Sequence, residues 1–184
     1  MLGKGRVGMT KKIFREEFRT GTNIVNIGWQ GNVEKELGIE GLTQFGYISG
    51  YKDAADTLVK EVLGVSLADA YVFPIVFLYR QYLELVLKNL YVKIYGKNTK
   101  MDHNLSIWEK VRKKIKDKTT KEQRELIDSV IDEFQHIDPR SFHFRYFWNL
   151  DYSSTLPNKM SVDLDLLKKR IDQVDSILFD SYGG

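Results

Sequence analysis

The chain has 184 residues, a hydrophobic share of 42% and no cysteine. This length fits one domain with enough apolar residues for a core, and the lack of cysteine excludes disulfides and thiolate zinc sites. The formal net charge is +3, but residues 1–20 hold six Lys/Arg and two Glu, so the rest of the chain is nearly neutral. We interpret this basic arm either as a solubilising terminus or as a contact for phosphate.

The N-terminal stretch has no apolar region typical of a signal peptide, and the most apolar run, "AYVFPIVFLY" at residues 70–79, is shorter than a membrane span. We therefore expect a cytoplasmic protein that does not enter a membrane. Glycines at positions 21, 28, 31, 38, 41 and 46 break regular structure. They predict two parts: a basic arm with an irregular Gly-rich segment at residues 1–45, and a helical domain at residues 46–184.

Helical periodicity begins in "YISGYKDAADTLVKEVLG", where apolar residues recur every three or four positions until Gly64 ends the pattern. Residues 71–95 follow with apolar side chains around nearly the whole circumference, which predicts a central and most buried helix. Asp69 is placed to cap this helix, Pro74 is compatible with it in the first turn, and Gly96 ends it.

Three further helices are predicted after residue 103. The first has one apolar stripe, made of Leu105, Trp108, Val111 and Ile115. The second begins with a capping box, Thr120 to Gln123, and stops before Pro139. Its inward residues are Leu126, Ile127, Val130, Ile131 and Phe134. The last begins near Ser161 and packs through Leu164, Leu167, Ile171, Val174 and Leu178. Together the five helices predict an all-α fold, a helical bundle.

Charged residues stand out on the central helix, where Arg80, Glu84 and Lys88 are four residues apart. One interpretation is a surface ladder of i,i+4 ion pairs, and the other is that Glu84 orients a basic group from another segment. We predict that this group is Arg145, in a buried or cleft-lining ion pair with Glu84. His143 or His103 is then expected within reach of the same cleft.

The segment "DPRSFHFRYFW", residues 138–148, alternates aromatic and polar residues and predicts a short extended strip. Its rings either close the core or stack on bases beside arginine, as in single-strand binders. The basic run "KVRKKIKDK", residues 110–118, is either a solvated helix face or a positive surface that attracts RNA or DNA. His103, His136 and His143 have no metal-ligand spacing, so we expect neither a metal site nor a cofactor.

The stretches "FPIVFLYRQYLELVLKNL", "HNLSIWEKV" and "DPRSFHFRY", with "GYKDAADTLV" before them, occur in an order that resembles the HEPN superfamily. The resemblance is to an uncharacterised bacterial branch linked to abortive infection, and it covers roughly residues 46–178. It implies a HEPN-like helical bundle, frequently dimeric, and many such proteins cut RNA with an Arg and a His about four to six residues apart. None of His103, His136 and His143 has an arginine at that distance before it, and Arg140 is too close to His143.

The resemblance leads to a first hypothesis: an intracellular module that binds RNA or a nucleotide-related partner, such as a nucleotidyltransferase, in phage defence or a toxin–antitoxin setting. A metal-independent endoribonuclease is one alternative, with His143 or His103 as general base and Arg145 or Arg140 at the phosphate. A non-enzymatic dimerisation module is the other. The candidate binding residues are Arg80, Glu84, Lys88, Arg140 and Tyr146. A homodimer is expected because the central helix and Trp29, Trp108 and Trp148 offer more apolar surface than one small bundle covers.

Overall fold

The computed structural model describes residue 35 and residues 41–64, 68–97, 104–156 and 159–182. The chain divides into two compact units, Met1–Thr43 and Gln44–Gly184. The helices discussed below belong to the second unit, except that residues 42 and 43, which begin the earliest of them, fall in the first unit. The basic arm, most of the Gly-rich segment, Trp29 and His103 lie outside the described residues.

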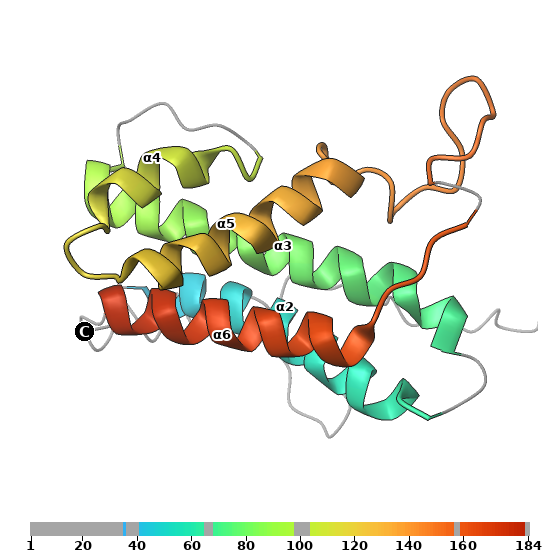
Figure 1. Ribbon diagram of the computed structural model, residues 1–184, viewed down its shortest axis with the longest axis horizontal. Helices are drawn as coiled ribbons and strands as arrows, with labels where there is room; N and C mark the ends of the chain where they lie inside the picture. The colour runs from blue at the N-terminus through green and yellow to red at the C-terminus, as the bar shows by residue number, and fades with distance from the viewer. Residues whose placement is uncertain (1–34, 36–40, 65–67, 98–103, 157–158, 183–184) are drawn as a thin grey trace, which may run out of the picture. The chain divides into compact units, whose positions relative to one another are not determined.

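Five α-helices make up the second unit over the described residues, which confirms the predicted all-α class (Figure 1). They are α2 (Leu42–Val62), α3 (Ala68–Tyr95), α4 (Ile107–Lys114), α5 (Lys121–Ile137) and α6 (Leu164–Tyr182). Helix α3 packs against α4 and α6, and α5 packs against α6. The described part contains no β-strand beyond one isolated bridge between Trp148 and Ser154.

Helix α2 begins at Leu42, earlier than the predicted boundary at residue 46, so Gly46 and Gly50 lie inside a helix. A glycine within a helix costs about 1 kcal/mol relative to alanine. Packing offsets this cost, because Ile48 and Tyr51 lie against the hydrophobic core. The predicted stop is confirmed: Gly64 follows the helix with a φ of +85°, a conformation that glycine adopts without strain.

Helix α3 is the central helix, as predicted, and its inward side chains from Ile75 to Tyr91 form much of the core. It is the one described helix long and apolar enough to cross a membrane, and its inward face is instead covered by the other helices. The helix begins at Ala68, so Pro74 lies in the second turn and not in the first. Pro74 is exposed there, where water can satisfy the carbonyl that loses its partner.

The last three helices follow their apolar stripes. The predicted capping box is confirmed in α5: the Thr120 hydroxyl accepts from the Gln123 N–H at 3.2 Å, and the Gln123 side chain accepts from the Thr120 N–H at 2.8 Å. Helix α6 begins three residues later than predicted, because the carboxylate of Asp163 accepts from the Leu166 N–H at 2.9 Å and caps the helix there.

A polar network that the sequence did not reveal joins α2, α3 and α6. The Lys52 ammonium lies 2.8 Å from Asp56 and 2.6 Å from Asp172, and the Tyr79 hydroxyl donates to Asp56 at 2.6 Å. The Tyr82 hydroxyl donates to Asp175 at 2.6 Å. Burial raises the pKa of Tyr79 and Tyr82 far above their usual 10.0, and the bonds to the aspartates raise it further. Both tyrosines therefore stay neutral in the folded protein.

We expect the free energy of unfolding to fall as pH rises above about 10. Tyr79 and Tyr82 ionise near that pH in the unfolded chain but not in the fold, so the unfolded state gains stability by releasing protons. Urea denaturation between mildly alkaline and strongly alkaline pH measures this slope. Tyr79→Phe/Tyr82→Phe should flatten it, whereas Tyr47→Phe, at an exposed position of α2, should follow the wild-type curve. Equal slopes in all three proteins would contradict the assignment.

Candidate functional site

Arg80 is fully buried at the middle of α3 and reaches the turn that follows α5. Its Nε donates to the carbonyl of Asp138 at 2.9 Å, and its Nη2 donates to the carbonyl of Pro139 at 3.4 Å. Its Nη1 donates to Glu84 at 3.0 Å, and Lys88 donates to the other oxygen of that carboxylate at 2.6 Å. The predicted ladder exists, but its first two members are buried, and Arg80 is the residue that contacts another segment.

The predicted ion pair between Glu84 and Arg145 is wrong. The Glu84 carboxylate is taken by Arg80 and Lys88. The Arg145 guanidinium instead donates to the carbonyl of Ser141 and lies 5.3 Å from the centre of the Tyr146 ring. Glu84 does not need a cation from a distant segment, because Arg80 and Lys88 lie one turn away on either side of it on the same helix.

Asp138 organises the turn between α5 and the rest of the segment. Its Oδ1 accepts hydrogen bonds from the backbone N–H groups of Phe142 and His143, at 2.7 and 3.1 Å. Its Oδ2 and the Ser141 hydroxyl are buried and have no hydrogen-bond partner among the described residues. Ser141 also has a φ of 54°, in the left-handed region that favours glycine. The turn therefore combines two unsatisfied polar atoms with a strained residue.

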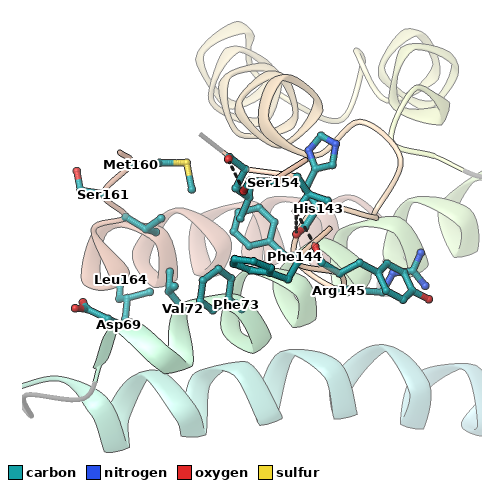
Figure 2. A pocket seen from close by; sticks show the side chains of 15 residues that line it. Asp69, Val72, Phe73, His143, Phe144, Arg145, Ser154, Met160, Ser161 and Leu164 are labelled. Atoms are coloured by element: carbon teal, nitrogen blue, oxygen red, sulfur yellow. Dashed lines mark hydrogen bonds between the residues drawn. The ribbon is translucent and has the colours of Figure 1, made fainter. Parts of the chain in front are cut away.

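His143 donates a hydrogen bond to the end of α5. Its Nδ1 lies 2.6 Å from the carbonyl of Ile137, which can only accept, so Nδ1 carries the proton of this bond. Figure 2 shows the imidazole and Arg145 pointing in different directions from the turn. His136 is exposed near the end of α5. The predicted cleft with a histidine beside Glu84 is therefore not formed by His143, and His103 lies outside the described residues.

The predicted extended strip is replaced by a tight turn and a short hairpin. The N–H groups of Arg145 and Tyr146 donate to the carbonyl of Phe142, which closes the turn. Residues 146–155, here named the aromatic hairpin, then fold back on themselves and project beyond the bundle (Figure 1). Phe144 is buried, but the exposed apolar residues of the hairpin are Tyr146, Phe147, Trp148, Leu150 and Tyr152. Packing into the core therefore explains the presence of Phe144 but not that of these five exposed residues.

A cavity of about 770 Å³ lies beside the base of the hairpin (Figure 2). Helix α3 contributes Val72 and Phe73, the segment before α6 contributes Met160 and Val162, and the hairpin side contributes Phe144 and Phe147. Its lining is mainly apolar, and Arg145 extends along its rim. Such a surface suits an apolar group, and the charged residues Asp69 and Arg145 also line it.

The basic run forms a second candidate site at the other end of α3. Seven exposed lysines, named the basic pole, gather on α4, the residues after it and the end of α3: Lys93, Lys97, Lys110, Lys113, Lys114, Lys116 and Lys118. Lys110 and Lys114 lie over the rings of Tyr91 and Tyr95, at 5.7 and 5.9 Å from their centres. These contacts fix α4 against α3.

Arg112 does not belong to the basic pole, although its place in the run predicted it. The Nε and Nη2 of Arg112 each donate to an oxygen of Asp128 on α5 at 2.7 Å, and the Trp108 indole donates to the same carboxylate at 2.8 Å. Burial opposes ionisation of Asp128, but the bonds from Arg112 and Trp108 outweigh it and lower the pKa of Asp128. Trp108 is thereby part of the core and cannot support dimerisation as the sequence suggested.

Among the described residues, no group of three or more His, Cys, Asp or Glu side chains is arranged to hold a metal ion. Comparison of the chain with protein-family models, curated proteins and solved structures finds no match. The resemblance to the HEPN superfamily therefore stays a prediction. The two features that the chain itself offers are the basic pole and the aromatic hairpin with its cavity.

Arg80→Met should lower the free energy of unfolding by about 3–5 kcal/mol, because it leaves the buried Glu84 with Lys88 as its one remaining partner and leaves the carbonyls of Asp138 and Pro139 without their donor. Urea denaturation measures the change. Lys121→Met is the control, since the Lys121–Glu125 pair has the same i,i+4 spacing but is largely exposed, and its loss should cost no more than about 1 kcal/mol. Similar losses in both variants would show that the Arg80 contacts are not special.

Ser141→Gly should stabilise the protein by about 1 kcal/mol. It relieves a left-handed φ and removes a buried unpaired hydroxyl, and these gains exceed the entropy that glycine adds to the unfolded chain. Tyr152→Gly is the matched control, because Tyr152 has a φ of 63° but an exposed side chain. A larger gain at Tyr152 in thermal denaturation would mean that the Ser141 hydroxyl finds a partner after all.

Proposed function

We propose that the protein is an RNA-binding module that holds the phosphate backbone on its basic pole. The observation that carries this proposal is the concentration of seven exposed lysines at one end of a nearly neutral fold, with Glu109 and Asp117 as the exposed carboxylates among the described residues of this stretch. Phosphate contacts by lysine supply most of the affinity of sequence-independent nucleic-acid binding, through the release of counterions.

The anchoring of α4 supports this proposal. The Tyr95 hydroxyl donates to the carbonyl of Lys110, and the Arg112–Asp128 pair fixes the opposite side of the same helix to α5. Lys113, Lys114 and Lys116 are therefore presented on a fixed backbone. A fixed array of cations loses less conformational entropy on binding than a flexible basic tail does.

The resemblance to the HEPN superfamily favours RNA over DNA, together with a cytoplasmic role in phage defence. The positions of His143 and Arg145 favour a binding module over a ribonuclease. A general base and a phosphate-binding arginine must face the same phosphate. His143 instead donates to the end of α5, while Arg145 lies over Phe77 and Tyr146.

Lys113→Glu/Lys114→Glu should weaken binding of a labelled single-stranded RNA by about tenfold or more, measured by fluorescence anisotropy at several salt concentrations. The loss of about two phosphate contacts should also reduce the slope of log affinity against log salt by about 1.4. Both residues are exposed, and because Lys114 also lies over the ring of Tyr95, a thermal melt of the double variant establishes that it is folded.

The control is Lys60→Glu/Lys169→Glu, which makes the same charge change at exposed positions of α2 and α6. It should retain most of the affinity and the wild-type salt slope. Equal losses in the two double variants would indicate a response to net charge alone and would contradict a basic-pole site. Intact RNA after prolonged incubation with wild type in EDTA is expected of a binding module, and specific cleavage that His143→Ala abolishes would favour the ribonuclease alternative.

A further inference from the structure

We infer that the aromatic hairpin and the cavity beside it form the contact surface for a second copy of this chain. In this arrangement two hairpins lie antiparallel about a two-fold axis, and the tip of each reaches the cavity of the other. The inference is independent of RNA binding, because it uses none of the residues of the basic pole.

The exposed apolar area of the hairpin is the first reason. Tyr146, Phe147, Trp148 and Tyr152 are 51%, 69%, 57% and 81% exposed, and Leu150 is fully exposed. At roughly 150–250 Å² for each aromatic side chain, these five residues leave on the order of 700 Å² of apolar surface in water. Monomeric proteins rarely expose so much in one place. It is close to the ~800 Å² that each partner contributes to a stable interface.

The order of the hairpin is the second reason. Two backbone hydrogen bonds close the hairpin: the Asn149 N–H donates to the Ser153 carbonyl at 2.9 Å, and the Thr155 N–H donates to the Phe147 carbonyl at 3.2 Å. At the base, the Thr155 hydroxyl donates to the carbonyl of Tyr146. An isolated two-stranded hairpin is marginally stable in water. Here the turn at Asp138 fixes the base, while the rings toward the tip contact one another and no part of the core. A second hairpin would cover them.

The shape of this surface, a protrusion beside a hollow, suits contact with a second copy of the chain. A two-fold interface brings the same patch of each subunit together, so the patch must contain both a protrusion and a hollow that accepts it. The hairpin is the protrusion, and the adjacent cavity of about 770 Å³ is the hollow. The cavity is lined by Phe73, Met160 and other apolar side chains, and it can take an aliphatic or aromatic group such as Leu150 or Tyr152.

Charge agrees with the antiparallel arrangement. Asp151 lies at the exposed tip, and Arg145 lies at the base, on the rim of the cavity (Figure 2). Hydrogen bonds from Ser153 lower the pKa of Asp151, so this carboxylate is ionised at neutral pH. Antiparallel hairpins place the tip of one copy beside the base of the other, which brings the two opposite charges together twice in each dimer. A parallel arrangement would bring like charges together.

Sedimentation velocity across a range of micromolar concentrations tests the inference. Wild type should be a dimer, and Leu150→Arg should raise the dimer dissociation constant by about tenfold or more, because it puts a charge into an apolar cavity. Phe179→Arg is the control: Phe179 is 63% exposed on α6, outside the hairpin and the cavity lining, and its replacement should leave the dimer intact. Thermal melts of both variants establish that each is folded.

The charge arrangement is tested separately by reversal. Asp151→Arg should weaken the dimer, and the combined Asp151→Arg/Arg145→Asp variant should recover it, which no general effect on folding would produce. Three results would overturn the inference: a wild-type monomer throughout the range, a dimer that Leu150→Arg leaves unchanged, or a dimer that Phe179→Arg disrupts equally. A wild-type monomer whose affinity for RNA falls in Leu150→Arg would assign the hairpin to RNA instead.

Discussion

The buried guanidinium of Arg80 decides where the functional part of the chain lies. A guanidinium taken out of water is costly unless its donors are satisfied, and here they are used by Glu84 and by the carbonyls of Asp138 and Pro139. Those carbonyls belong to the turn after α5, 58 residues further along the chain. Because Asp138 in turn holds the N–H groups that start the next segment, Arg80 fixes the base of the aromatic hairpin to the central helix.

The same central helix separates the two candidate surfaces. Phe73 lines the cavity and Tyr95 contacts α4, and their separation of 22 positions along α3 corresponds to about 33 Å of helix. The proposed hairpin interface uses no residue of the basic pole. Two such sites joined in one dimer would hold a long RNA more tightly than either site alone, because the second contact would be intramolecular. The proposed dimerisation and the proposed RNA binding would therefore support one another without sharing a residue.

Local patterns in the sequence predicted the helices well. The stripes of α4 and α5, the capping box at Thr120 and the central place of α3 depend on neighbouring residues, and all appear in the structure. Contacts between distant segments were missed because they do not depend on neighbouring residues. Nothing local distinguishes Arg112, which is paired with Asp128, from the exposed lysines beside it. The charge of Arg80 and its spacing from Glu84 were visible, but its partners outside α3 are backbone carbonyls, which carry no sequence signal.

The alternating pattern after Pro139 misled for a more specific reason. Alternation indicates a strand when one face is covered, yet only Phe144 of these rings enters the core, because the bonds to Asp138 coil residues 142–146 into a turn. That turn contains a strained serine and two buried polar atoms without hydrogen-bond partners in the described chain. Each feature costs stability, and such costs gather where a particular geometry matters more than stability does. Here the geometry they maintain is the direction of a hairpin that carries exposed aromatic residues away from the bundle. The proposed dimer would explain both the strain at the base of the hairpin and the apolar surface along its length, because each would serve to present the hairpin to a second copy.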